Sequence, residues 1–293
     1  MTLGLQDLAF LAAGSVSGPR LWTFADATTE LWVRPDDAAT VTIATGTSIS
    51  GLADKSGSGR NFTGATGSQP TLLSNALNSK AALALNGSQW LTSASSAATW
   101  NFLHTTGGII VAAWKAGNSS NPNALYALLG NNALLTGSHG FSLFYDDRSS
   151  ATRNDRVVGQ VTRGVSGVPT TLNISSDDAH PPSQPVIVTH IFDPGNAVAA
   201  KRSILRVNGT SIELNTSTNA ASSANATNPL QIGAAGGNAN PLVGELYEIG
   251  IFPLSAGLAT VERAEGYLAG PTEWNLQSML AAGHPFKSYP PMI

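Results

Sequence analysis

From about Leu21 onward the chain alternates between short apolar runs and clusters of Gly, Pro, Ser, Thr and Asn. Short apolar runs bounded by turn-forming residues are typical of β-strands, because a helix needs a longer stretch with apolar residues three and four apart. The pattern therefore predicts many short strands. The predicted ranges are 82–85, 108–114, 124–129, 140–145, 156–161, 186–192, 203–207, 211–214, 230–232 and 244–252.

The clearest local signal lies between two of these strands, where the chain reads Asn208-Gly209. A two-residue type I′ turn needs positive φ at both central positions, and Asn and Gly adopt that conformation most easily. We therefore predict a β-hairpin that turns at Asn208-Gly209.

One segment near the C-terminus has helical periodicity instead. Ser255 stands where a helix N-cap is expected, and Gly270-Pro271 stops the helix at its other end. The capping box is incomplete, because an apolar residue stands three positions after Ser255. Many strands with a single late helix predict an all-β, antiparallel sandwich. The apolar residues that recur on one helix face are Leu258, Val261, Ala264 and Leu268.

Residues 1–20 precede the strand pattern and hold a short apolar run. A cleaved signal peptide is disfavoured, because the first positive side chain is Arg20 and Asp7 interrupts the run. Burying five apolar side chains gains roughly 7–15 kcal/mol, which is similar to the cost of ordering about a dozen residues. We therefore predict a docking arm (residues 1–20) that needs a surface to settle on, beside one domain (residues 21–293). Its apolar residues are Leu3, Leu5, Leu8, Phe10 and Leu11.

Composition excludes several functional classes. Charged residues make up 11% of the chain, against about 25% in typical proteins. The net charge is −3 and the pI is about 5.9, so nucleic-acid binding is not expected. The absence of Cys excludes disulfides, zinc knuckles and thiol catalysis. No run reaches the roughly 18 to 20 apolar residues that a membrane span needs.

Three separate segments carry recognisable motifs. They are 30–41 followed by 52–61, then 81–91, and then 244–252 followed by Glu265-Gly-Tyr-Leu-Ala, Trp274-Asn-Leu, Gly283-His-Pro-Phe and Pro290-Pro. In this order and spacing they resemble the concanavalin A-like, laminin-G-like jelly-roll proteins of bacteriophage and bacterial surfaces, over residues 21–293. Leu52 departs from the family pattern, which has Trp there. The resemblance implies a jelly-roll sandwich and a place in a virion.

The resemblance also allows a test for enzymatic function. Glycoside hydrolases with this jelly roll carry carboxylates two positions apart, so that both point into the groove from one strand face. Glu245 and Glu248 are three apart in the predicted strand 244–252, so we expect them to face opposite sides, with Tyr247 on the face of Glu245. The hydrolase pattern fails, and a non-enzymatic protein is predicted. The adjacent pairs Asp36-Asp37, Asp146-Asp147 and Asp177-Asp178 are interpreted as solvated turns.

Other catalytic patterns have little support. No Gly-x-Ser-x-Gly elbow accompanies the Ser and five His residues. The Gly-rich stretch 233–237 lacks a following helix start and Lys, so a tight loop is favoured over phosphate binding. His284, in a Gly-His-Pro turn, could act as a metal ligand or general base, but a structural role is favoured.

A glycan site would need an aromatic ring beside polar side chains. Trp114 precedes a loop and is the Trp best placed to reach a rim, although a core position is favoured even for it. The densest group of polar residues is 145–148 with 153–155. Oxygen ligands for Ca²⁺ would come from this polar loop, with Asp193 or Asp177 approaching, but no EF-hand spacing is present. The candidate glycan-binding residues are Trp114, Tyr145, Asp146, Asp147, Arg148 and Asp155.

Together these observations predict a non-enzymatic bacteriophage virion protein, on the capsid surface or the tail, with a lectin-like domain. Its expected partners are other virion proteins, host-surface glycans and further copies of itself. Weak sugar contacts become effective when many copies are displayed. No cofactor is expected, and Ca²⁺ is the one candidate ion. The alternatives are a carbohydrate-binding module of a secreted bacterial surface protein and a glycan-degrading enzyme.

Overall fold

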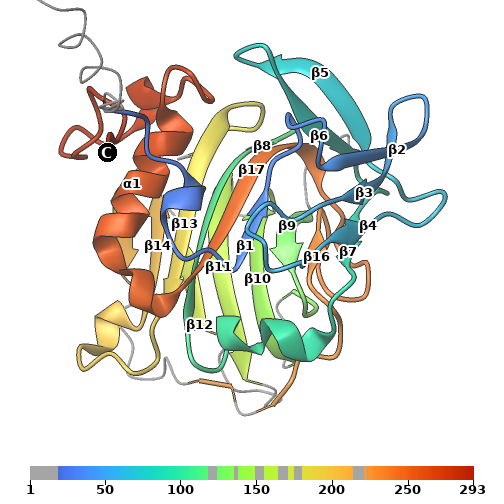
Figure 1. Ribbon diagram of the computed structural model, residues 1–293. Coiled ribbons are helices and arrows are strands. Elements are labelled where there is room, and N and C mark those ends of the chain that lie inside the picture. The colour runs from blue at the N-terminus through green and yellow to red at the C-terminus, as the bar shows by residue number, and fades with distance from the viewer. Residues whose placement is uncertain are drawn as a thin grey trace, which may run out of the picture.

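The computed structural model describes residues 19–117, 124–134, 138–148, 155–163, 171–174, 180–213, 221–222 and 224–293 (Figure 1). The apolar residues of the predicted arm lie outside the described residues. The strands are β1 (Leu31–Val33), β2 (Val41–Thr45), β3 (Ser48–Leu52), β4 (Phe62–Thr63), β5 (Thr71–Leu77), β6 (Lys80–Asn86), β7 (Leu91–Ser93), β8 (Gly108–Ala116), β9 (Leu125–Gly130), β10 (His139–Asp146), β11 (Arg156–Arg163), β12 (Thr171–Ile174), β13 (Pro185–Phe192), β14 (Ser203–Val207), β15 (Thr210–Glu213), β16 (Gln231–Ile232) and β17 (Val243–Pro253). The helices are 3-10 turns η1 (Phe24–Asp26), η2 (Ala97–Leu103), η3 (Ala199–Lys201), η4 (Leu254–Ala256) and η5 (Gln277–Met279), and α-helix α1 (Gly257–Ala269).

The strands form two facing layers. In the first, β17 pairs with β8 on one side and with β6 and β1 on the other, and β13, β14 and β15 follow β8. In the second, the order runs β12, β11, β10, β9, β16, β7, β4, β3, β2. β5 pairs with β6 and touches β3, which joins the layers at one edge. All pairings between these strands are antiparallel, so the predicted jelly-roll-like β-sandwich is confirmed.

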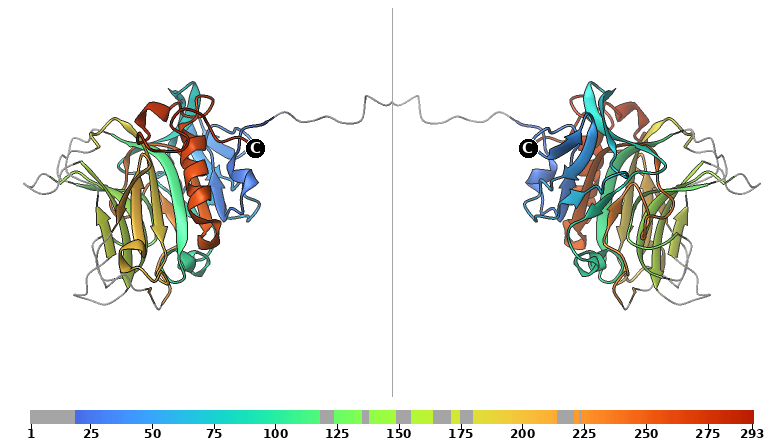
Figure 2. Two further views of the ribbon diagram at one scale, coloured as in Figure 1. Left: turned by 90° about the vertical axis from the view of Figure 1, so that its left-hand side faces the viewer. Right: turned by 90° about the vertical axis from the view of Figure 1, so that its right-hand side faces the viewer.

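Apolar side chains fill the space between the layers and also cover the outside of the first layer. The inner core takes the inward residues of β8, β10 and β17, which alternate with outward ones as a pleated strand requires. The outer core lies between the first layer and α1, where Trp22, Phe24 and Trp274 pack beside the helix. Figure 2 shows α1 on the outer face of this layer. The helix therefore shields one face of the first layer.

The predicted hairpin is confirmed. β14 and β15 pair from Val207 and Thr210 outward, and both turn residues have positive φ, 49° at Asn208 and 81° at Gly209. The turn also touches the C-terminal segment, because Ala281 donates its N–H to the Asn208 carbonyl at 2.8 Å. A Cβ added at Gly209 would lie 2.6 Å from Cδ2 of His284.

The close approach of Gly209 to His284 predicts a loss of stability that can be compared with a second glycine, Gly46, which has positive φ but no such neighbour. We expect Gly209→Ala to lower the free energy of unfolding by about 1–2 kcal/mol for the left-handed backbone, plus about 1–3 kcal/mol for overpacking against His284. Gly46→Ala, in the turn between β2 and β3, should lose only the first amount, because its φ is also positive (58°) but no atom lies within 4 Å of the added Cβ. Urea unfolding measures both variants. Equal losses would contradict the contact.

The start of α1 corrects the sequence prediction. The N-cap is Ala256 instead of Ser255, because Ser255 is taken up by η4 and the helix begins at Gly257. Leu258 consequently turns away from the core and is 54% exposed, whereas Val261, Ala264 and Leu268 are buried as predicted. The end of the helix agrees with the prediction, with Gly270 as its C-cap.

The expected orientation of Glu245 and Glu248 was wrong. Along β17, Leu246 lies opposite Trp114, but Glu248 lies opposite the next residue of β8, Ala113. Tyr247 is therefore an extra residue in a β-bulge, which shifts the alternation by one position. As a result both carboxylates face the outer side of the first layer, where Tyr247 also lies in the outer core.

The two ends of the domain lie together. Arg20 and Ile293 exchange backbone hydrogen bonds at 2.9 Å, and Trp22 donates to the Pro291 carbonyl at 2.9 Å. No helix in the described part of the chain has the length and apolarity needed to cross a membrane.

Candidate functional site

The predicted glycan-binding loop is only partly assembled. Trp114 is fully buried in the inner core, where its ring packs edge-on against Tyr145 at 6.2 Å between centroids. It therefore cannot stack on a sugar at the surface, because its place on β8 points it between the layers. The Tyr145 ring is buried as well. Only its hydroxyl extends to the polar groups, 2.6 Å from Oδ1 of Asp155 and 2.8 Å from the His180 carbonyl oxygen.

The remaining loop residues do form a polar cluster. Arg148 holds Asp146 through two hydrogen bonds of 2.8 Å, which occupy both carboxylate oxygens. Burial, and then the nearby charge of Asp155, raise the pKa of Asp147. Asp193 lies at the far end of β13 from this cluster, and Asp177 lies outside the described residues. In the described ranges no three acidic or histidine side chains are arranged to hold a metal ion, so Ca²⁺ stays a prediction.

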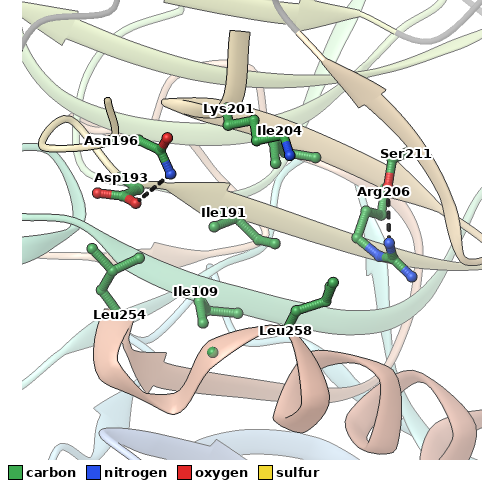
Figure 3. Close-up of a pocket in the computed structure, with 11 residues that line it drawn as sticks. Ile109, Ile191, Asp193, Asn196, Lys201, Ile204, Arg206, Ser211, Leu254 and Leu258 are labelled. Carbon is green, nitrogen blue, oxygen red and sulfur yellow. Dashed lines mark hydrogen bonds between the residues drawn. The ribbon is translucent and has the colours of Figure 1, made fainter. Parts of the chain in front are cut away.

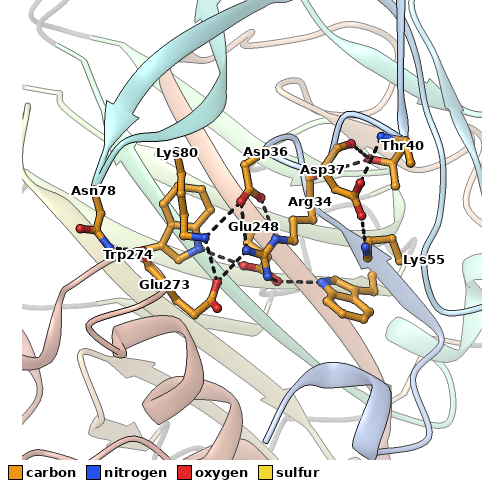
Figure 4. A network of polar contacts seen from close by, with 12 residues as sticks. Arg34, Asp36, Asp37, Thr40, Lys55, Asn78, Lys80, Glu248, Glu273 and Trp274 are labelled. Carbon is orange, nitrogen blue, oxygen red and sulfur yellow. Dashed lines mark hydrogen bonds and ion pairs between the residues drawn. The ribbon is translucent and has the colours of Figure 1, made fainter. Parts of the chain in front are cut away.

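A buried carboxylate, Glu248 of β17, connects that strand to β1, to α1 and to Trp274 of the C-terminal segment. It accepts hydrogen bonds from Trp32 Nε1 (2.7 Å), Trp274 Nε1 (2.9 Å) and Tyr267 Oη (3.1 Å). Arg34 lies at 4.0 Å and also pairs with Asp36 and Glu273 (Figure 4). Burial raises the pKa of Glu248 to about 7. Because Glu248 has no solvent exposure, it cannot reach a substrate, and this network links the sheet to the C-terminal segment.

A second buried carboxylate, Glu265 of α1, lies against β13 and β14. Arg206 binds it through two hydrogen bonds of 2.8 Å, and Thr189 Oγ1 donates a third at 2.8 Å. His284 Nδ1 accepts the Phe286 N–H, so its Nε2 carries the proton that points to Glu265 at 3.0 Å. Burial acts to raise the pKa of Glu265, but the bonds from Arg206 and His284 outweigh it and lower that pKa. His284 therefore has the structural role that the sequence analysis favoured.

Glu245 and Glu248 do not form the carboxylate pair of a glycoside hydrolase. Although the bulge brings Glu245 and Glu248 to one side of the sheet, Glu245 binds Lys115 Nζ at 2.6 Å and accepts from Tyr247 Oη at 3.0 Å. Glu248 is sealed from solvent. Glycoside hydrolysis needs two carboxyl groups open to the same bound sugar, and this arrangement does not provide them.

Two serines contact histidines. Ser203 Oγ lies 3.1 Å from His190 Nε2, inside the sandwich, where burial lowers the pKa of His190 to about 3. Ser222 Oγ contacts His139 Nδ1. Among the described residues no carboxylate is found to orient either imidazole, so neither pair meets the requirements of a nucleophilic triad.

An open groove of about 320 Å³ lies between the start of α1 and the ends of β13 and β14 (Figure 3). Its floor is aliphatic, and its polar groups stand at separate points along the walls. The floor residues are Ile109, Ile191, Ile204, Leu254 and Leu258, and the polar side chains are Asp193, Asn196, Lys201, Arg206 and Ser211.

Hydrogen bonds within the protein fix most of the polar side chains that line the groove. The chain turns at Asp193 after β13, and the Asn196 N–H closes that turn on the Asp193 carbonyl at 3.0 Å. Asn196 Nδ2 also donates to Asp193 Oδ2 at 2.9 Å. Arg206 is held by Glu265 and donates from Nη1 to Ser211 Oγ at 2.8 Å. The exposed Lys201 ammonium, by contrast, has no hydrogen-bond or ion-pair partner within the described part of the chain.

Sequence reasoning missed this groove. Its lining comes from β8, β13 and the turn after it, η3, β14, β15, η4 and the start of α1, which only the fold brings together. The one sequence signal was Asp193, which had been considered as a Ca²⁺ ligand.

No protein-family model matches the sequence, and no curated protein matches it either. Several solved structures are similar in part. The Ruminococcus gnavus IT-sialidase CBM40, bound to α2,3-sialyllactose, is 18% identical over 51% of this chain and 76% of that chain, with a TM-score of 0.39. The NanB sialidase of Streptococcus pneumoniae is 16% identical over 61% and 26%, with a TM-score of 0.42. The binding domain of botulinum neurotoxin DC in complex with SialylT is 11% identical over 78% and 48%, with a TM-score of 0.46.

Proposed function

We propose that this chain is a lectin-like, non-enzymatic binding protein that takes a sugar in the groove beside α1. The observation that carries the proposal is the lining of the groove, in which an aliphatic floor meets polar side chains spaced along the walls. A pyranose has the matching chemistry, with C–H groups on its faces and hydroxyls around its edge. The volume of about 320 Å³ falls within the range of roughly 300–1,000 Å³ found for small-molecule sites.

The groove favours binding over hydrolysis. Among its described lining residues Asp193 supplies the one carboxylate, whereas glycoside hydrolysis uses two. Glu265 is close in the fold but lies behind Arg206, with both its oxygens occupied. Asp193 can therefore accept hydrogen bonds from sugar hydroxyls, but it has no partner carboxyl group for a displacement.

Binding to individual sugars tests the proposal. We expect ligand-observed NMR to detect methyl glycosides of glucose, galactose or mannose with dissociation constants between about 0.1 and 10 mM, which correspond to about −5.5 to −2.7 kcal/mol. If no glycoside of this panel binds in that range, the proposed function is wrong.

We further propose that the sandwich is displayed on a bacteriophage virion, at the capsid or the tail. This part rests on the jelly-roll sequence resemblance and on the apolar run in residues 1–20. Many displayed copies would turn millimolar sugar contacts into useful adhesion through effective concentration. The competing assignment, a secreted bacterial carbohydrate-binding module, would use the same groove but predicts a processed N-terminus in the mature protein.

Deleting residues 1–20 tests the virion assignment. We expect the shortened protein to keep its fold, because the deletion removes the exposed pairing of Arg20 with Ile293 and Asp26 but leaves both cores in place. It should lose most of its incorporation into particles. Quantitative blotting of purified particles measures the occupancy. A full-length chain with Leu73→Asp on β5 controls for the handling of mutant particles. Unchanged occupancy of the deletion variant would refute the arm.

A further inference from the structure

We infer that the groove selects acidic sugars, with the carboxylate of a hexuronic acid bound at Lys201. The inference rests on the proposed function, because it names the sugar class for the same site.

The two ends of the groove differ in hydrogen-bonding character. Asp193 and Asn196 lie together at one end, and Arg206 with Ser211 lies at the other, while Lys201 projects from the wall between them (Figure 3). The Asp193 N–H donates to the Arg202 carbonyl at 2.8 Å, so Asp193 is level with Arg202, four residues before Arg206. At about 3.3 Å per residue, the ends lie about 13 Å apart along the strand. That span exceeds a single pyranose ring.

The two cationic side chains of the groove differ in whether the described part of the protein pairs them with a carboxylate. The Arg206 charge is neutralised by Glu265 through two hydrogen bonds. Lys201 has no such partner among the described residues. Gly257 lines the same groove at the start of α1, where no side chain caps the helix, and the helix dipole adds a partial positive charge there. An incoming carboxylate would therefore supply the missing counter-charge.

The Asp193 end explains why the anion should be a sugar and not a fatty acid. Asn196 occupies one oxygen of Asp193, which leaves the other to accept from a ligand hydroxyl. An alkyl chain along the aliphatic floor would cover Asp193 and Asn196 without offering any hydrogen bond, and burying polar groups in this way is unfavourable. A single uronic acid can meet Asp193 with its hydroxyls and Lys201 with its carboxylate, because Lys201 lies between the two ends of the groove.

The test compares matched sugars on the full chain. Methyl glycosides of glucose, galactose and mannose are titrated beside the glycosides of the corresponding uronic acids, with octanoate as a non-sugar carboxylate. For the sugar that binds, we expect the uronate to bind about three- to fivefold tighter, the effect of one partly exposed ion pair. Lys201→Met should reduce this preference to less than about twofold. The preference is the ratio of the two affinities on the same variant, so a change in affinity that is common to both sugars does not enter it.

Two controls make the outcome specific. Arg263→Gln removes an exposed cation from the same helix, beside a different hollow near Trp22, and should leave the preference unchanged. Raising the salt concentration should shrink it in the wild-type chain, because exposed ion pairs are screened.

Each outcome decides between the proposals. Equal binding of neutral and acidic sugars, or the same preference in Lys201→Met, overturns the acidic-sugar inference and leaves the sugar groove intact. Tighter binding of octanoate than of any sugar overturns it in favour of a lipid-like acid. If no sugar binds at all, the proposed function itself fails.

Discussion

Leu258→Asp is expected to weaken the binding of a neutral methyl glycoside more than tenfold while leaving the fold intact. Leu258 forms part of the groove floor and is 54% exposed. An aspartate removes the aliphatic surface beneath the sugar and adds a second negative charge to the groove lining, which already holds Asp193. Stability should change by less than about 0.5 kcal/mol, because exposed positions tolerate substitution and an acidic residue suits the first turn of a helix.

The matched control is Leu73→Asp on β5, which is 38% exposed and lies outside the groove. Ligand-observed NMR gives the affinity, and urea unfolding confirms that both variants are folded. A neutral glycoside is used, so that charge repulsion of the ligand does not contribute. If Leu258→Asp bound the glycoside as tightly as Leu73→Asp, the groove would not be the sugar site.

Glu265→Leu is expected to lower the free energy of unfolding by about 3–5 kcal/mol, the usual result of removing one partner from a buried ion pair. Arg206 would remain buried without its counter-charge, and the donors of Thr189 and His284 would lose their acceptor. The loss should be large because this carboxylate links α1, β13, β14 and the C-terminal segment.

The double variant Arg206→Met/Glu265→Leu tests the cause. It replaces the charged pair with apolar side chains, so it should recover much of the lost stability. Glu262→Leu, one turn earlier on the same helix, should change stability by less than about 1 kcal/mol, because Glu262 is partly exposed. Urea unfolding compares the three. A double variant no more stable than Glu265→Leu alone would contradict the account of the ion pair.

Much of the fold could be predicted because the inner strands follow simple rules. The predicted ranges 108–114, 186–192 and 203–207 lie within β8, β13 and β14, since apolar runs between turn residues mark strands that are buried by a neighbouring layer. The hairpin at Asn208-Gly209 followed from backbone preference alone. The edge strands β2 and β5 were missed because much of their length is exposed and their residues are mixed.

Other errors came from features that leave no local pattern. A bulge at Tyr247 reversed the expected orientation of Glu248. The order of apolar and polar residues in that strand does not indicate a bulge. Ser255 was a reasonable N-cap, but η4 placed it before the helix. The groove was invisible in the sequence because Ile109 and Leu258, which share its floor, come from elements far apart along the chain.

The most direct test of the central claim is backbone NMR of the labelled chain during titration with the glycoside that binds, followed over a day at saturation. We expect the shifts to concentrate in 191–206 and 254–258 while the sugar signals stay unchanged, because the groove binds without turnover. Shifts confined to other segments, or the appearance of a free reducing sugar, would contradict the account.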